Sequence, residues 1–369
     1  MYDSVSLFSG AMGLDLGLES AGISFRLCQD FDPSCYATML KNGRPGMTGD
    51  IRQISAQDIL DRSGFSVGEP FLICGGPPCQ PFSTAGKRLG VNDPRGSLFM
   101  DYVRMVNEIR PRFFVFENVK GLTSISVDPG GAPGGVLDII LSEFDRIGYK
   151  TVHGVLDAVY YGVPQFRERM IIIGSRDQED VFLPLPSHFQ RHQNPSMRWR
   201  TLRDVISGLE DDPGPCAQFS EERLKFLALV PEGGNWRDLP PDLQPAAMGG
   251  AYKSGGGKVG FYRRLSYSQP SPTVVTSPVQ KATMMCHPAR QRPLSVREYS
   301  RIQQFPDSWQ ITGTVSSQYR QIGNAVPVGL ANAVGLAVIA TANGTSSIYT
   351  KRMRGTSAHA NGGLPNGCQ

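Results

Sequence analysis

The stretch Gly75-Gly76-Pro77-Pro78-Cys79-Gln80-Pro81-Phe82-Ser83 places one cysteine in a loop framed by prolines. It follows Phe71-Leu72-Ile73-Cys74, an apolar run typical of a buried parallel strand. The prolines fix φ on both sides of Cys79 and reduce the entropy lost when its sulfur is held in one attacking geometry. A lone cysteine is more often a buried structural residue. That description fits Cys74, whereas the loop favours Cys79 as a nucleophile.

A carboxylate follows a second apolar run. Glu117-Asn118-Val119 comes directly after Phe113-Phe114-Val115-Phe116. Open α/β sheets bind their ligands at the edge where the carboxyl ends of parallel strands meet, so we expect Glu117 to lie near Cys79. Desolvation at the end of an apolar strand raises the pKa of a carboxyl group and suits it to hold a proton for a ring nitrogen. The alternative is a glutamate that caps a helix or forms an ion pair.

Two arginines precede a third apolar run. In Gln165-Phe166-Arg167-Glu168-Arg169, directly before Met170-Ile171-Ile172-Ile173, the alternation points both guanidinium groups to one face of an extended segment. Fixed guanidinium groups can hold a carbonyl oxygen or a phosphate. The alternative is an ordinary ion-paired edge strand.

A glycine turn, Ser9-Gly10-Ala11-Met12-Gly13, separates the first strand from the first helix. The unit resembles a nucleotide-binding loop, although it departs from GxGxxG. Asp30, about 20 residues on, closes the second strand where a carboxylate accepts hydrogen bonds from ribose hydroxyls, and Phe31 can cover an adenine face. Asp50 follows at the same edge and can reach an adenine amino group. The alternatives are a surface Asp30 and a core Phe31. No P-loop lysine follows these turns, which favours a nucleoside without a polyphosphate.

Strand and helix patterns alternate along the first half of the chain. We expect strands at 4–8, 25–28, 49–51, 71–74, 113–116, 152–156 and 170–173, and helices at 14–21, 33–40, 56–62, 97–109 and 136–146. This alternation predicts an α/β lobe with a mainly parallel sheet. Frequent prolines and glycines from 175 to 260 predict a smaller, loop-rich lobe. A helix returns near 295–304, and the segment 319–340 ends in an apolar helix with Val326, Leu330 and Val334 at core spacing.

Composition narrows the class of protein. The chain has 369 residues, of which 40% are hydrophobic, and its net charge of +4 is compatible with a polyanionic partner. Its 7 cysteines lack CxxC spacing and follow no secretory signal, which predicts reduced thiols in a cytoplasmic protein without structural zinc. No run of 18 apolar residues occurs, so no membrane span is expected.

Five segments, in this order, closely resemble the cytosine-5 DNA methyltransferases of bacterial restriction-modification systems. They are 8–13, 77–80, 117–119, 165–169 and Gln321-Ile322-Gly323-Asn324-Ala325-Val326-Pro327. The resemblance implies a Rossmann-like α/β lobe that uses S-adenosylmethionine at 1–174 and a target-recognition lobe at 175–263. It further implies a bracing segment and a returning helix at 264–341, before a disordered tail at 342–369. The implied protein is a monomer that acts on duplex DNA without a metal or a membrane.

The resemblance also assigns roles. Carbon 5 of cytosine is too electron-poor to attack a methyl sulfonium, so the thiolate of Cys79 first adds to carbon 6 of a base rotated out of the duplex. Glu117 then holds or protonates ring nitrogen 3, Arg169 holds the carbonyl oxygen, and Arg167 orders the loop. The implied cofactor residues are Phe8, Gly10, Gly13, Asp30, Phe31, Asp50, Ile51, Pro78, Leu98, Asn324 and Val326, and the implied DNA contacts are Gln80, Ser83, Arg95 and Arg264.

Some choices stay open at this point. Many relatives have Glu and Trp where this chain has Asp30 and Phe31, which bears on the ribose contact. A transfer-RNA methyltransferase on the same fold is one alternative, and the long second lobe disfavours it. A catalytically silent nucleic-acid binder is another, and the intact set of Cys79, Glu117 and Arg169 disfavours it. The second lobe offers further candidate contacts to nucleic acid in Trp199, Trp236, Arg237 and Lys258, for each of which a structural role is the favoured alternative.

Overall fold

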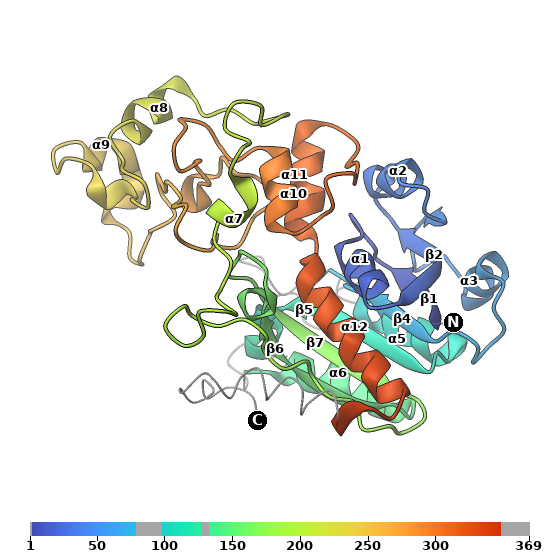
Figure 1. Cartoon of the computed structure of the whole chain (residues 1–369). Helices are drawn as coiled ribbons and strands as arrows, with labels where there is room; N and C mark the ends of the chain where they lie inside the picture. Colours follow the sequence, from blue (N-terminus) through green and yellow to red (C-terminus); the bar gives the residue numbers. More distant parts are fainter. Residues whose placement is uncertain (1, 79–97, 127–132, 348–369) are drawn as a thin grey trace.

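The computed structural model describes residues 2–78, 98–126 and 133–347. A sheet covered by helices on both faces forms one part of the molecule, and a loop-rich part adjoins it (Figure 1). The strands are β1 (Tyr2–Leu7), β2 (Ile23–Asp30), β3 (Gly46–Thr48), β4 (Leu72–Gly75), β5 (Phe113–Val119), β6 (Lys150–Asp157) and β7 (Glu168–Ser175).

The seven strands form one sheet in the order β3-β2-β1-β4-β5-β7-β6. Strands β1 to β5 pair in parallel, whereas β7 runs antiparallel to both of its neighbours, β5 and β6. The predicted α/β class and mainly parallel sheet are therefore confirmed. The carboxyl ends of β1, β2, β4 and β5 meet at one edge of the sheet, and the antiparallel β7 brings its first residues to the same edge.

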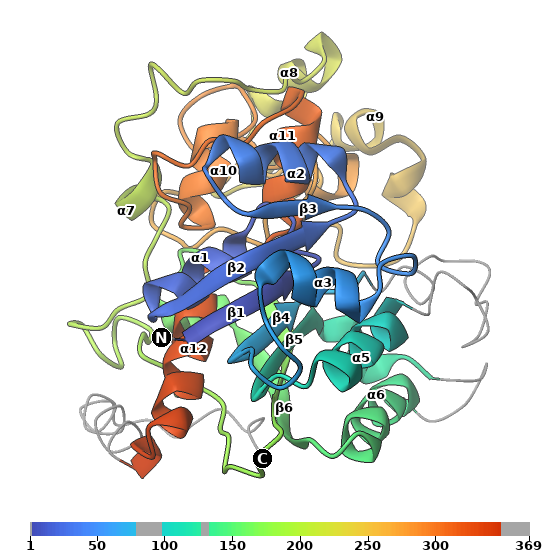
Figure 2. The ribbon, with the colours of Figure 1, turned by 90° about the vertical axis from the view of Figure 1, so that its right-hand side faces the viewer.

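Helices cover both faces of the sheet (Figure 2). One face packs against α3 (Ala56–Ser63), α5 (Leu98–Ile109) and α6 (Gly135–Arg146). The other packs against α1 (Gly13–Ser20) and α12 (Val328–Ala342). The helix α2 (Pro33–Lys41) lies next to β2 and β3. Strands β4, β5 and β7 are buried on both sides and read as continuous apolar runs, which explains why the sequence pattern predicted them.

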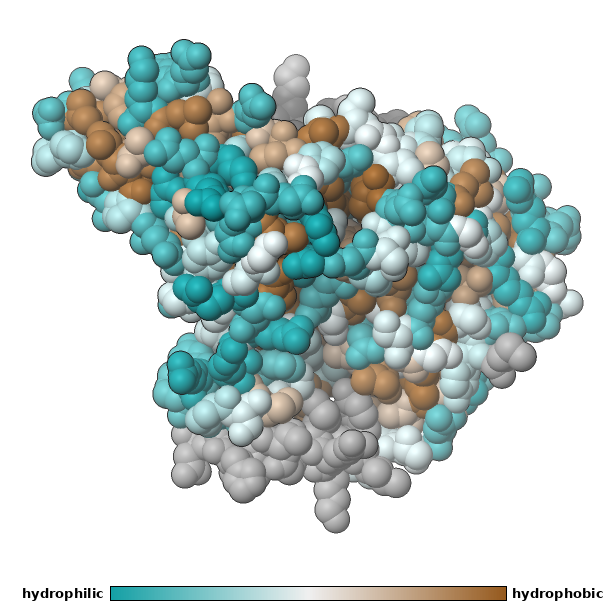
Figure 3. Space-filling view, turned by 45° about the horizontal axis from the view of Figure 1, so that its top comes forward, coloured by the Kyte–Doolittle hydropathy of each residue, from teal (hydrophilic) through white to brown (hydrophobic). Residues whose placement is uncertain are grey.

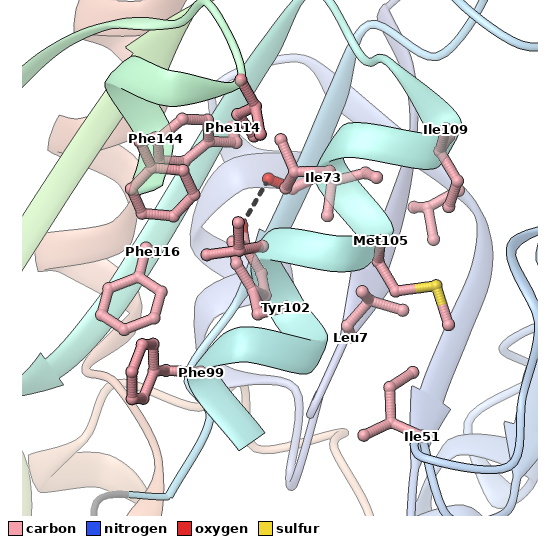
Figure 4. Close-up of a cluster of buried hydrophobic side chains, with 14 of the residues drawn as sticks. Leu7, Ile51, Ile73, Phe99, Tyr102, Met105, Ile109, Phe114, Phe116 and Phe144 are labelled. Carbon is pink, nitrogen blue, oxygen red and sulfur yellow. Dashed lines mark hydrogen bonds between the residues drawn. The ribbon is translucent and has the colours of Figure 1, made fainter. Parts of the chain in front are cut away.

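Strand β5 shows how the two cores are built. Phe114 and Phe116 point into the core below α5, while Phe113 and Val115 point to the α1 and α12 side. Phe114 stacks on Phe144 of α6 with ring centroids 4.0 Å apart (Figure 4). The hydroxyl of Tyr102 lies between the carbonyl oxygens of Ile73 at 3.0 Å and Val115 at 2.9 Å and shares its single hydrogen between them, which satisfies a buried polar group and links β4 to β5.

The loop-rich part contains α7 (Arg203–Ile206), α8 (Glu221–Leu227), α9 (Gln244–Met248), α10 (Val296–Ile302) and α11 (Val315–Asn324). Short 3-10 helices occur in this part at Trp236–Asp238, Gly249–Lys253 and Lys281–Thr283, and between strands of the sheet at Lys120–Ser124 and Ala158–Tyr161. Apolar side chains reach the surface of this part (Figure 3), among them Leu229, Tyr252 and Val259, which lie close to α8 and α9 in sequence. The predicted domain limits at 174, 263 and 341 stay predictions.

Two expected elements differ in the structure. The third strand is β3, and it ends at Thr48, before the predicted 49–51. The predicted helix containing Val326 is wrong, because α11 ends at Asn324 and α12 starts at Val328. Pro327 explains the break, since proline disfavours helical backbone at the residue before it and cannot donate an N–H bond. Val326 therefore lies in the link between the two helices.

The region of the predicted tail at 342–369 begins in ordered structure. Helix α12 continues to Ala342, and the description ends at residue 347. The stretch Val315–Ala342 is long and apolar enough to cross a membrane by composition, but 61% of its most apolar window is buried inside the protein. Within this stretch, α12 packs against α1 as part of the core.

Candidate active site

The carboxylate of Glu117 and the guanidinium of Arg169 form an ion pair at the carboxyl edge of the sheet. The Nε atom of Arg169 lies 2.8 Å from Oε1 of Glu117, and both side chains are almost fully buried. The antiparallel pairing of β5 with β7 sets this distance, because it places Val119 opposite Arg169. The ion pair named as the alternative for Glu117 is thus present, at the place expected for the site.

The electrostatics of this pair combine opposing effects. Burial raises the pKa of Glu117, while the charges of Arg169 and Arg167 and the hydrogen bond from Arg169 lower it, and the net effect is a raised pKa. The apolar run before Glu117 predicted this direction. A carboxyl group with a raised pKa can carry a proton at a pH where an exposed glutamate would not.

The segment that leads to Cys79 touches the same carboxylate. A Cβ atom built on Gly76 would lie 2.6 Å from Oε2 of Glu117, so any other residue here would displace the carboxylate from its present position. The side-chain amide of Asn118, which is buried, donates to the carbonyl oxygen of Pro77 at 3.1 Å. Cys79 itself, with Gln80, Ser83 and Arg95, lies outside the described residues. Its expected closeness to Glu117 stays a prediction that these two contacts support. Cys74, expected to be structural, is fully buried.

Arg167 lies inside the protein rather than at a surface. Its side chain is 1% exposed, and the guanidinium donates to the carbonyl oxygens of Val274 at 2.9 Å and Gly323 at 2.6 Å. Within the described part of the chain its Nε atom has no hydrogen-bond partner. Burial and the charge of Arg169 lower the pKa of Arg167, although a guanidinium stays protonated in proteins. Arg167 therefore holds two distant chain segments at the base of the site.

The glycine turn and the acid of the second strand are joined directly. The backbone N–H of Gly10 donates to Oδ2 of Asp30 at 2.7 Å, and that of Asp32 donates to Oδ1 at 2.8 Å. Burial raises the pKa of Asp30, so this residue is not the surface aspartate of the alternative. A Cβ atom on Gly13 would lie 2.2 Å from the carbonyl oxygen of Val326, so glycine is required there for the α11–α12 link to reach the turn.

The remaining cofactor candidates lie around this turn. Phe31 is 68% exposed, which excludes the alternative of a core phenylalanine. An exposed aromatic ring beside a buried carboxylate, at the edge where α/β sheets bind ligands, fits an adenosine group. Asp50 forms an ion pair with Arg52, its Oδ1 lying 2.9 Å from Nε. Of the others, Phe8 and Leu98 are partly buried, Ile51 and Val326 are buried, and Pro78 and Asn324 are exposed.

Arg264 is a buried brace. Its guanidinium donates to four backbone carbonyl oxygens, at distances of 2.7 to 3.1 Å, and these belong to Leu227, Val230, His287 and Arg290. The predicted contribution of Arg264 to DNA binding stays a prediction, and it would act through the shape of this region. Among the other candidate contacts, Arg237 donates to the carbonyl oxygen of Gly257 at 2.9 Å and Lys258 to that of Tyr252 at 3.1 Å.

Sequence reasoning gave no role to three buried polar residues near the site: Asn118, Asp15 and Gln303. A role for Asn118 could have been predicted, because Asn118 is a polar residue at the same strand end as Glu117. Asp15 and Gln303 carry no local signal, since their surroundings come from distant segments. Within 2–78, 98–126 and 133–347, no group of three or more His, Cys, Asp and Glu side chains could hold a metal ion.

Comparison of the chain with known proteins identifies one family. The family model described as C-5 cytosine-specific DNA methylase matches residues 2–340. The chain is 42% identical over 350 residues to the Type II methyltransferase M.PspPI of Psychrobacter sp. (strain TA137), covering 93% of this chain and 80% of that protein. It is 39% identical over 350 residues to the Type II methyltransferase M.Eco47II of Escherichia coli, covering 92% and 79%.

Solved structures give the same fold at low identity. The Entamoeba histolytica methyltransferase EhMeth matches with a TM-score of 0.63 and 14% identity, over 92% of this chain and 98% of that chain. DNMT2 of Spodoptera frugiperda matches with a TM-score of 0.60 and 17% identity, over 92% and 100%. At such identities the likeness concerns the fold alone.

Proposed function

Because the chain belongs to the family of C-5 cytosine-specific DNA methylases, we propose that it methylates carbon 5 of a cytosine in duplex DNA with S-adenosylmethionine as the methyl donor. The relatives of highest identity named above are Type II methyltransferases. We therefore propose that the enzyme protects host DNA in a restriction-modification system, as a monomer in the cytoplasm. Residues 175–263 would form its target-recognition lobe.

The proposed reaction begins with Cys79. Its thiolate adds to carbon 6 of a cytosine turned out of the duplex, and the electron pair of the carbon 5–carbon 6 double bond moves toward carbon 5 and ring nitrogen 3. S-adenosylmethionine supplies an electrophilic methyl group. Carbon 5 takes that group, its proton is then removed, and the double bond re-forms as the thiolate of Cys79 leaves.

The observation that carries this proposal is the buried pair of Glu117 and Arg169. A glutamate with a raised pKa can donate a proton toward ring nitrogen 3, which stabilises the negative charge that thiolate addition sends there. Arg169 lies within hydrogen-bond distance of that carboxylate and can hold the neighbouring carbonyl oxygen of the base. Gly76 and Pro77 contact Glu117 and Asn118, which supports placing Cys79 beside the same ring.

The chain also has the parts that a methyl donor needs. Gly10 and Gly13 shape the turn, Asp30 closes it, and Phe31 offers an exposed ring for the adenine. Asp50 and Asn324 lie at partly or fully exposed positions for further polar contacts. No phosphate-binding lysine accompanies the turn, consistent with a donor that has no polyphosphate.

Bisulfite sequencing of plasmid DNA from an expressing host tests the substrate, the modified position and the target sequence together. We expect one short sequence to be protected at one cytosine. Transfer RNA from the same cells, sequenced in the same way, serves as the control for the RNA alternative. Methylation of RNA but not of plasmid DNA would refute the proposal.

The covalent step has its own test. A duplex with 5-fluorocytosine at the identified position should stay attached to the protein in denaturant, because the abstractable proton on carbon 5 is absent. The Cys79→Ala variant should bind this duplex and form no adduct. Turnover by Cys79→Ala, or a wild-type complex that dissociates in denaturant, would show that the nucleophile is another group.

A further inference from the structure

The side-chain amide of Gln303 lies at the centre of a buried polar network. Gln303 follows α10 and is 0% exposed. Both hydrogens of its Nε2 atom are used, one on the carbonyl oxygen of Ile322 at 2.8 Å and one on that of Ala325 at 3.1 Å. These two carbonyl groups flank Gly323 and Asn324, where α11 ends. Gln303 therefore fixes the path of the chain through the α11–α12 link.

The same amide accepts a hydrogen bond from a second buried glutamine. Nε2 of Gln165 donates to Oε1 of Gln303 at 3.0 Å, and Oε1 of Gln165 accepts from the backbone N–H of Val274 at 2.8 Å. Gln165 is 0% exposed and 138 residues away in sequence. Arg167 makes a parallel bridge, since its guanidinium reaches the carbonyl oxygens of Val274 and Gly323.

The network thus joins three segments that are far apart in sequence: 164–167 before β7, 271–275, and the link at 322–326. Ser271 and Pro164 are joined by a backbone bond of 2.8 Å, and Phe166 donates its N–H to the carbonyl oxygen of Ser271 at 2.9 Å. The segment 271–275 lies in the loop-rich part, between α9 and α10 in sequence. A change in its position would reach the α11–α12 link through the two glutamines.

The link in turn limits the glycine turn. The carbonyl oxygen of Val326 lies against Gly13 so closely that no side chain fits between them. Any shift of Ala325 or Val326 would therefore move the glycine turn or change the position of Asn324 relative to it. Buried packing of this kind is bistable rather than freely deformable, so small shifts are transmitted rather than absorbed.

From these contacts we propose that Gln303 is a positioning residue that sets the α11–α12 link against the glycine turn and couples it, through Gln165, to the segment 271–275. The inference rests on the proposed function, in which this turn binds the methyl donor and the loop-rich part binds DNA. It gives a physical route by which DNA binding and donor binding reinforce each other, with equal factors in both directions.

The test replaces Gln303 with methionine, which has a similar length and no amide. The carbonyl oxygen of Ala325 then loses its donor, and Nε2 of Gln165 loses its acceptor. Binding of S-adenosylmethionine, measured by calorimetry, should weaken about tenfold, which corresponds to about 1.4 kcal/mol. The KM for the donor should rise by a similar factor while kcat changes less than about twofold.

Gln304→Met is the matched control. Gln304 is the next residue and also bridges two backbone groups, accepting from the N–H of Gly329 at 3.0 Å and donating to the carbonyl oxygen of Gly162 at 2.8 Å. It does not touch the link at 322–326. We expect it to lower the thermal unfolding midpoint and leave donor affinity unchanged. If both variants weaken donor binding equally, the effect is general destabilisation and the positioning role is refuted.

The coupling is measured by donor calorimetry with and without a duplex that carries the sequence found by bisulfite sequencing. We expect the duplex to tighten donor binding to the wild type, and this factor to fall toward one in Gln303→Met and in Gln165→Met. A factor that is unchanged in both variants would refute the coupling. Failure of the proposed function would give a different result: the wild-type protein itself would neither methylate DNA nor bind S-adenosylmethionine.

Discussion

The fully buried carboxyl group of Asp15 should make the stability of the protein depend on pH near neutrality. Asp15 lies in the first turn of α1, beneath the glycine turn, and is 0% exposed. In the described part of the chain no donor has hydrogen-bond geometry to either carboxylate oxygen. Burial raises the pKa of Asp15 to about 7; the hydroxyl of Ser6 and the thiol of Cys28 lie close enough to lower the pKa, although neither reaches full hydrogen-bond geometry. Burial is the main cause, because the side chain is wholly enclosed.

The size of the effect follows from the shift. A pKa of about 7 in the folded protein against 3.8 for an ordinary aspartate is a difference of about 3 units, or about 4 kcal/mol. Because the folded pKa is the higher one, the folded protein binds the proton more tightly. The stabilisation is complete below pH 3.8 and is lost as the pH rises through about 7. Asp15→Asn keeps the shape and removes the titration.

The assay is urea unfolding of the wild type and Asp15→Asn from pH 5 to pH 9. The free energy of unfolding of the variant, relative to the wild type, should rise by a few kcal/mol between these limits. Asp58→Asn is the control: hydrogen bonds from Ser55 lower the pKa of Asp58, so its carboxylate stays ionised in the folded and unfolded protein across this range, and the difference between Asp58→Asn and the wild type should not change from pH 5 to pH 9. A difference between Asp15→Asn and the wild type that stays constant with pH would refute the reasoning.

Three further substitutions test the site. Glu117→Gln should lower kcat by about 10² to 10⁴ and abolish the fall in the wild-type rate as pH rises through the raised pKa of Glu117; identical pH profiles would contradict its role as a proton donor. Phe31→Ala should weaken donor binding about tenfold in calorimetry with an unchanged unfolding midpoint, since the ring is 68% exposed; a loss of DNA affinity instead would place the adenine elsewhere. Gly13→Ala should lower the free energy of unfolding in urea by about 1 to 3 kcal/mol and weaken donor binding, because the added carbon would lie 2.2 Å from the carbonyl oxygen of Val326. If neither the free energy of unfolding nor the donor affinity changes, the α11–α12 link can move without cost and does not fix the turn.

The strands and the charged groups at their ends could be predicted from the sequence. A strand buried on both faces shows itself as consecutive apolar residues, so the polar residue that follows must lie at the sheet edge, as Glu117 does. Arg169 precedes its apolar run instead of following it, so the alternation with Arg167 and the resemblance to the family indicated it, and the antiparallel direction of β7 was not predicted. That direction brings the start of β7, rather than its end, to the site.

The residues that were missed depend on contacts between distant segments. Asp15 occupies a helix of moderate amphipathicity, in which a charged residue normally marks the solvent side. Helix α1 lies between the sheet and α12, so even this position is enclosed. The amides of Gln165 and Gln303 carry no sequence pattern, because their partners are backbone groups of other segments. The break at Pro327 was visible in the sequence, but the apolar spacing of Val326 and Leu330 outweighed it.

Two close approaches at glycines define the geometry of the site. At Gly13 the backbone of the link before α12 touches the turn after β1, and at Gly76, directly after β4, the backbone touches the side-chain carboxylate of Glu117 of β5. The side proposed to bind the donor is thus held by backbone packed on backbone, and the side proposed to bind the base by backbone packed on the buried carboxylate. Arg167 then ties the link at Gly323 to the residues that precede Arg169. These contacts hold the groups proposed to act on the base in a fixed position relative to the donor. Alignment of a methyl group with carbon 5 requires such a fixed position.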